Sequence, residues 1–136
     1  MKILFDTNVV LDALLDREPF SRAALQLFTQ VETGKLTGLL SATTITTIFY
    51  LATKVLGKAP ATKAITQLLR LFEVAPVHRL VLEEALTLDF SDFEDAVLCQ
   101  AGLHAGAQAI VTRDRLGFKK ATIGVYTPEE LLGHFI

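Results

Sequence analysis

Two aspartates stand just after short apolar runs that lie far apart in the sequence. Asp6 follows Ile3-Leu4-Phe5, and Asp114 comes shortly after Ala109-Ile110-Val111. Each run is typical of a short strand buried on both faces of a parallel sheet. If the two strands are neighbours, both carboxylates face one crevice at the carboxyl ends of the strands, where open α/β folds place their ligands.

Carboxylates that share a crevice repel each other and raise each other's pKa unless a cation neutralises them. A divalent metal ion with oxygen ligands is the usual partner of such a pair. The alternative is that Asp6 and Asp114 are turn residues or helix caps at the strand ends. One aspartate alone favours this alternative, whereas two at matched positions make metal binding an equal contender.

A third aspartate belongs to a helix that is predicted to open at Ser91. Ser91 and Glu94 have the Ser-x-x-Glu spacing of a capping box, which accounts for Glu94 without giving it any chemistry. Asp92 and Asp95 are three residues apart, so we expect them to share one helix face. The helix leads directly into the second acidic strand, and a right-handed crossover brings its N-terminal end near the crevice. We therefore expect Asp95 to join the two strand-end aspartates.

Four cations lie within eight residues around Asp114: Arg113, Arg115, Lys119 and Lys120. Most basic runs are solvated loops. Beside an acidic metal centre, however, a basic rim is what a phosphate backbone requires. Thr112 either orients a metal-bound water or only ends its strand.

The elements that must position these residues alternate along the chain. Strands are expected at residues 3–5, 36–40, 72–77, 109–112 and 122–126, and helices at 9–15, 20–32, 43–55, 60–71, 80–88, 91–105 and from 128 onward. This alternation predicts a mostly parallel sheet covered by helices on both faces. Pro76 suggests an edge strand, and Ser41 is a suitable cap for the helix that follows it.

The composition favours one folded domain over residues 1–136. The chain is 51% hydrophobic and 21% charged, which predicts a substantial core and argues against disorder. The single Cys99 excludes an internal disulfide framework and a cysteine-based zinc site. The N-terminal apolar run is too short for a signal peptide, and no stretch approaches membrane-spanning length, so we expect a soluble, cytoplasmic protein. The net charge of −2 argues against a dedicated duplex-DNA binder.

Three motifs follow one another along the chain: Asp6-Thr7-Asn8 after an apolar strand, Asp95-Ala96 at a helix start, and Val111-Thr112-Arg113-Asp114 with Phe118 beyond. In this order they resemble the PIN domain family over essentially the whole chain. The segments 6–15 and 92–96 are similar to the VapC-like PIN subfamily of toxin–antitoxin nucleases. The resemblance implies a three-layer α/β/α fold with a central, mostly parallel five-stranded sheet.

The resemblance also implies an activity, which is the hydrolysis of RNA phosphodiester bonds with Mg²⁺ or Mn²⁺ to leave 5′-phosphate and 3′-hydroxyl ends. The implied roles are catalysis and metal binding by Asp6, Asp95 and Asp114, support by Asn8 and Thr112, and RNA binding by Arg113 and Arg115. The implied partners are RNA, an antitoxin protein and a second copy of the chain. The apolar helices between residues 43 and 71 are the expected dimer interface.

One position departs from the family pattern. The family's second acid is usually a glutamate six residues after a serine, and counting from Ser41 reaches Thr47. We hypothesise that Asp92 partly replaces this glutamate; the competing interpretation is that Asp92 only complements the helix dipole. Thr47 favours an alternative function, a catalytically weak PIN module that binds RNA or a protein. A phosphatase with an aspartate nucleophile is disfavoured, because Asn8 stands where its second aspartate is needed.

Overall fold

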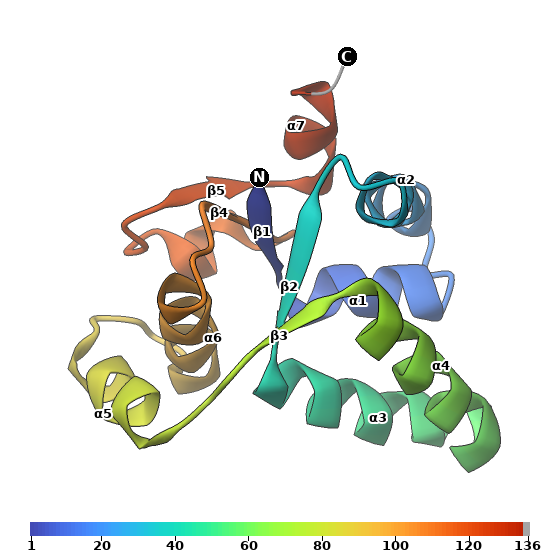
Figure 1. The fold of residues 1–136 in the computed structure, drawn as a ribbon, viewed down its shortest axis with the longest axis horizontal. Coiled ribbons are helices and arrows are strands. Elements are labelled where there is room, and N and C mark those ends of the chain that lie inside the picture. Colours follow the sequence, from blue (N-terminus) through green and yellow to red (C-terminus); the bar gives the residue numbers. More distant parts are fainter. Residues whose placement is uncertain (135–136) are drawn as a thin grey trace.

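The computed structural model describes residues 1–134, and its centre is a five-stranded sheet (Figure 1). The strands are β1 (Lys2–Phe5), β2 (Thr37–Ser41), β3 (Glu73–Ala75), β4 (Ala109–Val111) and β5 (Gly124–Tyr126). They lie in the order β3-β2-β1-β4-β5, and each neighbouring pair is parallel. The prediction of a five-stranded parallel sheet is confirmed, and the two strands that precede Asp6 and Asp114 are direct neighbours.

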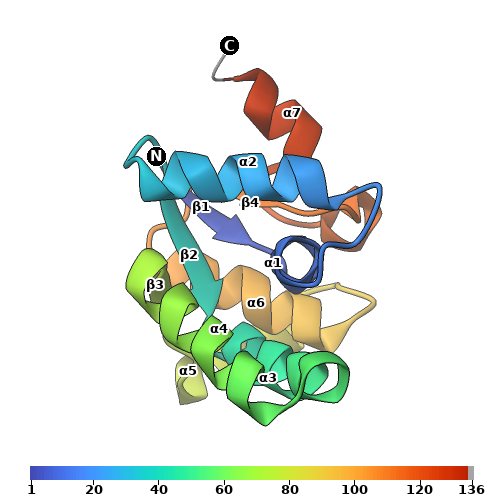
Figure 2. The ribbon, with the colours of Figure 1, turned by 90° about the vertical axis from the view of Figure 1, so that its right-hand side faces the viewer.

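Helices cover both faces of this sheet, which confirms the three-layer α/β/α architecture (Figures 1 and 2). In the part of the chain that the structure describes they are α1 (Thr7–Leu14), α2 (Ser21–Glu32), α3 (Ala42–Leu56), α4 (Lys58–Leu71), α5 (Arg79–Thr87), α6 (Phe93–His104) and α7 (Pro128–Gly133), with a 3₁₀ helix η1 (Arg115–Phe118). The α5–α6 pair lies on the opposite side of the sheet from α2 (Figure 1). None of these helices is both long and apolar enough to cross a bilayer.

The unbroken apolar run of β1 has a direct structural explanation. Ile3 and Phe5 pack into the core cluster under α2, whereas Leu4 points to the opposite cluster under α6. Phe5 also contacts the Phe72 ring edge to face, with 5.1 Å between the centroids. Because alternate side chains of a strand point to opposite faces, both faces of a central strand must be apolar.

The helix starts agree with the sequence prediction at Ser41 and differ at Ser91. The Ser41 side chain accepts a hydrogen bond from the backbone N–H of Thr43 at 3.3 Å, as expected of the α3 cap. The predicted capping box at Ser91 is wrong, because α6 begins at Phe93 and its N-cap is Asp92. Consequently Glu94 is not held by a cap, and Asp92 precedes the helix instead of sharing a face with Asp95.

Candidate active site

Asp6 lies at the carboxyl end of β1 and is only 7% exposed. It occupies the N-cap position of α1, but its side chain makes no capping hydrogen bond there, so capping does not account for this carboxylate. Its Oδ2 accepts a hydrogen bond from the Thr112 hydroxyl at 2.7 Å. Burial raises the pKa of Asp6; the negative charges of Asp114 and Glu94 add to this rise, while the Thr112 hydrogen bond opposes it.

Thr112 connects the two strand-end aspartates. Its hydroxyl donates to Asp6 and accepts the backbone N–H of Asp114 at 2.9 Å, and its side chain is fully buried. Asp114 caps η1, where its Oδ1 accepts the N–H of Gly117 at 3.2 Å. The cap interpretation therefore holds for one oxygen of Asp114, and the other oxygen remains available to the crevice.

Asp95 stands in the first turn of α6, and the Asp92 side chain accepts its backbone N–H at 3.2 Å. Burial raises the pKa of Asp95 to about 7, and repulsion from Asp6, Asp92 and Asp114 contributes to the shift. A carboxylate whose neighbours are mainly other carboxylates is an expected site for a cation.

Glu94 is the acidic residue of the crevice to which the sequence assigned no chemistry. It lines the same cavity as the three aspartates, and its Oε1 accepts a hydrogen bond from the Thr47 hydroxyl at 3.5 Å. Position 47 is where the PIN resemblance implies a second acid. The side chain of Glu94 thus reaches from α6 to the position on α3 where that acid is absent. The adjacent acids Glu94 and Asp95 were the only sequence signal for this contact, and the capping-box interpretation had assigned Glu94 to a helix cap instead.

These acids surround a cavity of about 390 Å³. Its lining residues include Asp6, Asn8, Asp92, Glu94, Asp95, Arg113 and Asp114. Gly117 lies close to two of these acids, because a Cβ atom there would lie 2.8 Å from Oδ2 of Asp114 and 3.2 Å from Oδ2 of Asp95. Two carboxylate oxygens from different segments therefore approach one point beside a residue that has no side chain.

The chemistry of this donor set fits a hard divalent cation. Carboxylate and amide oxygens are the ligands that Mg²⁺ and Mn²⁺ take in proteins. Asn8 also lines the cavity, and among residues 1–134 its buried Oδ1 has no hydrogen-bond partner, which is costly for a polar atom unless something binds it. Among residues 1–134, no three Asp, Glu, His or Cys side chains are already close enough together to hold one metal ion.

The two predicted RNA-binding arginines have different surroundings. Arg113 lines the crevice and donates from Nε to the buried Asp12 at 2.6 Å. Arg115 lies on η1, where its Nη1 contacts Glu130 at 3.1 Å on the exposed surface. The structure thus brings Arg113 to the acids and leaves Arg115 outside the cavity lining.

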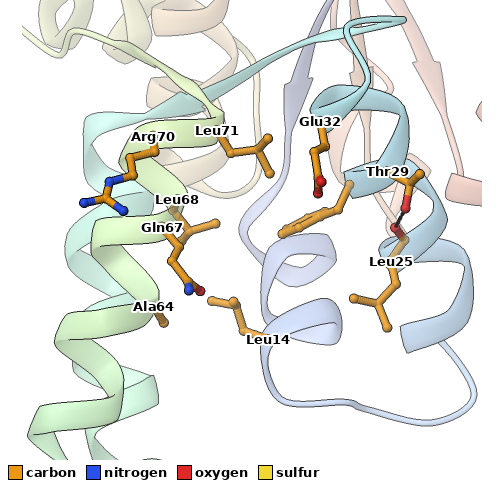
Figure 3. A pocket seen from close by; sticks show the side chains of 10 residues that line it. Leu14, Leu25, Thr29, Glu32, Ala64, Gln67, Leu68, Arg70 and Leu71 are labelled. Carbon is orange, nitrogen blue, oxygen red and sulfur yellow. Dashed lines mark hydrogen bonds between the residues drawn. The ribbon is translucent and has the colours of Figure 1, made fainter.

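A second cavity, of about 580 Å³, lies between α2 and α4 (Figure 3). Leu14, Leu25 and Leu68 point into it, and its charged lining residues are Glu32 and Arg70. This cavity is larger and more apolar than the acidic crevice. Because Glu32 is the single acid among its lining residues, the acidic crevice is the better candidate for phosphodiester chemistry.

A three-layer α/β/α fold with acids at the ends of β1 and β4 and at the start of α6 is the arrangement that the PIN resemblance implied. Residues 2–116 match the family model for the PIN domain, and the chain belongs to this family. The resemblance noted in the sequence is therefore confirmed.

Individual relatives share only a limited part of their sequence with this chain. The chain is 27% identical over 134 residues to Ribonuclease VapC1 of Aquifex aeolicus (strain VF5), with coverage of 95% of this chain and 92% of that protein. Its fold is similar to a chain of a toxin-antitoxin complex from Klebsiella pneumoniae, with a TM-score of 0.71, 22% identity and coverage of 93% and 97%. It is also similar to Mycobacterium tuberculosis VapC20, described as a sarcin-ricin loop cleaving toxin, with a TM-score of 0.65, 17% identity and coverage of 79% and 86%.

Proposed function

We propose that this protein is a ribonuclease that hydrolyses RNA phosphodiester bonds with the help of Mg²⁺ or Mn²⁺. The observation that carries the proposal is the meeting of Asp6, Asp95 and Asp114 around one cavity, with Thr112 linking two of them. The similarity to a protein named as a ribonuclease supports the choice of RNA as the substrate class.

The metal would be held by Asp6, Asp95 and Asp114, and we add Glu94 to this set. When bound, a divalent ion polarises the phosphate and lowers the pKa of an attacking water. Glu94 supplies the carboxylate that Thr47 lacks, because its Oε1 stays beside the Thr47 hydroxyl within the same acidic cavity. Asp92 would support Asp95 through its hydrogen bond to the Asp95 backbone.

The protein's own groups orient this centre. The Thr112 hydroxyl fixes one oxygen of Asp6 and, by accepting from the Asp114 backbone, sets the spacing of the two strand-end acids. The amide oxygen of Asn8 has no hydrogen-bond partner within residues 1–134, and it would support a bound ion or its water. Arg113, and at longer range Arg115, would bind the phosphate backbone of the RNA.

The same relatives support a biological setting. One solved neighbour is a toxin-antitoxin complex, and we propose that this protein is likewise a toxin that pairs with an antitoxin protein in the cytoplasm. We also propose a homodimer formed through α3 and α4. These two helices expose several large apolar side chains, namely Tyr50, Val55, Leu56 and Leu69.

The decisive experiment is a cleavage assay of the purified protein on single-stranded RNA with Mg²⁺, with Mn²⁺ and with EDTA. We expect cleavage with either metal, none with EDTA, and products with 5′-phosphate ends. The matched control is Asp89→Asn, which removes an exposed acid that pairs with Lys120 instead of facing the crevice. RNA binding without cleavage under every metal condition would favour the alternative of a catalytically weak PIN module.

A further inference from the structure

Asp12, on α1, is a buried carboxylate to which the proposed reaction gives no role. It is 1% exposed, and its Oδ1 accepts a hydrogen bond from Nε of Arg17 at 2.9 Å. Arg113, which follows β4, donates to the same carboxylate, with Nε at 2.6 Å and Nη2 at 3.2 Å. The Arg113 guanidinium carbon also lies over the Phe20 ring, 3.9 Å from its centroid, and this cation–π contact helps to hold the side chain in place.

The backbone turn after α1 brings Arg17 back over Asp12. Asp16 adopts a left-handed conformation with φ of 51°, and the N–H of Arg17 then donates to the Asp12 carbonyl at 3.1 Å. This pattern is a common helix ending, in which the residue after the left-handed one returns its N–H to the last turn. Nη2 of Arg17 donates in addition to the Asn8 carbonyl at 3.3 Å. Both the backbone and the side chain of Arg17 are therefore held in place.

Two arginines exceed what a buried carboxylate needs. One guanidinium is enough to neutralise Asp12, so Asp12, Arg17 and Arg113 together carry a net positive charge. Both arginines line the acidic crevice, and their side chains are still 39% and 30% exposed. Each uses Nε and Nη2 in these contacts, and within residues 1–134 Nη1 of each has no hydrogen-bond partner. The two groups therefore present fixed donors to whatever enters the crevice.

We propose that Arg17 and Arg113 form a clamp for a backbone phosphate of RNA, and that Asp12 is the positioning residue of this clamp. The choice of RNA rests on the proposed ribonuclease function. A guanidinium matches phosphate with parallel hydrogen bonds, and donors that are already held lose little freedom on binding. Because both arginines line the cavity of the acids, the clamped phosphate lies next to the proposed catalytic centre.

The clamp is tested by fluorescence anisotropy of a labelled single-stranded RNA oligonucleotide in EDTA, where the proposed reaction is stopped, over a series of KCl concentrations. Arg17→Ala should weaken binding by about tenfold, the low end for a charge-assisted hydrogen bond. It should also reduce the slope of log affinity against log salt by about 0.7. Arg17→Lys keeps the charge but loses the planar fork, so both its affinity and its salt slope should fall between those of the wild type and those of Arg17→Ala. The control Arg79→Ala removes the same charge from α5, where it pairs with Glu83 at 3.4 Å, and should change neither quantity.

Asp12→Asn gives an independent sign test. It removes a negative charge, so general electrostatics alone predicts tighter RNA binding, whereas loss of positioning predicts weaker binding. Wild-type affinity in both Arg17 variants, tighter binding by Asp12→Asn, or no RNA binding by the wild type would each overturn the clamp. A purely structural brace would lower the melting temperature of Arg17→Ala and leave its affinity unchanged. Because binding is measured without cleavage, a wild type that binds RNA but never cleaves it would refute the ribonuclease and leave the clamp standing.

Discussion

Replacing Asp95 by asparagine should stabilise the metal-free protein. The reason is that Asp95 has a pKa of about 7 instead of its ordinary 3.8, mainly because of burial and then because of Asp6, Asp92 and Asp114. Between these two pH values the unfolded chain has lost the Asp95 proton while the folded protein keeps it. Stability therefore falls as the pH rises from about 4 to about 7 and is level above this range. Asparagine carries no charge that the neighbouring carboxylates can repel, so the variant does not lose this stability as the pH rises.

The size of the effect follows from the shift. A pKa shift of roughly 3 units corresponds to about 4 kcal/mol if the whole shift contributes to the free energy of unfolding. Asp95 is partly exposed, so solvent screening reduces this figure to about 1–2 kcal/mol. Loss of a charge from the first turn of α6 removes about 0.3–1 kcal/mol of favourable helix-dipole interaction. Repulsion outweighs the dipole, and a net gain of about 1 kcal/mol, or about 3–5 °C in melting temperature, remains at pH 8.

The assay is thermal unfolding in EDTA between pH 4 and pH 8 for the wild type and Asp95→Asn. The two melting temperatures should nearly coincide at pH 4 and separate as the pH rises. The difference between the two curves isolates Asp95 from the other titrating groups. A suitable control is Glu32→Gln, which removes an acid from α2, outside the acidic crevice.

If Asp95→Asn melts below the wild type at pH 8, Asp95 stabilises the fold and is not a site of repulsion. A constant difference at all pH values would equally contradict the proposed repulsion. Added Mg²⁺ provides a second comparison. It should raise the melting temperature of the wild type more than that of the variant, because a cation relieves repulsion only where the charge is present.

The remaining predictions concern the other residues of the crevice. Asp6→Asn should abolish cleavage and melt no lower than the wild type in EDTA; a large fall in melting temperature would make Asp6 a structural residue. Asp92→Asn should weaken Mg²⁺ affinity and turnover by at least about tenfold, and an unchanged calorimetric titration would leave Asp92 as an N-cap alone. Glu94→Thr should lose Mg²⁺ affinity and regain it when combined with Thr47→Glu; a folded double variant without recovery would remove Glu94 from the proposed ligands. Gly117→Ala should slow single-turnover cleavage with little change in circular dichroism, because its Cβ would press on Asp114 Oδ2 at 2.8 Å, and wild-type rates would show that Asp114 tolerates displacement.

Much of the sheet was predictable because strand patterns are local. The apolar runs before Asp6 and Asp114 gave two buried strands, and the alternation of elements gave a parallel sheet, both of which the structure confirms. Pro76 correctly indicated an edge position, since it follows β3 at the end of the strand order. The ends of the shorter strands were less exact: the strand expected at 72–77 spans only Glu73–Ala75.

The sequence by itself predicted the class of fold and the convergence of Asp6, Asp95 and Asp114 on one crevice, because burial patterns, strand ends and helix starts depend on residues close in the chain. Only the tertiary structure decided which other side chains share their crevice. With Asp92 as the N-cap of α6, Asp95 occupies the third helical position in place of Glu94, so the Glu94 side chain is not drawn back to the cap. Glu94 thereby reaches Thr47, a contact between α6 and α3 that no local pattern encodes. The pairing of Arg113 with Asp12 has the same cause: a buried carboxylate takes the cation that packing brings to it, however distant in the chain.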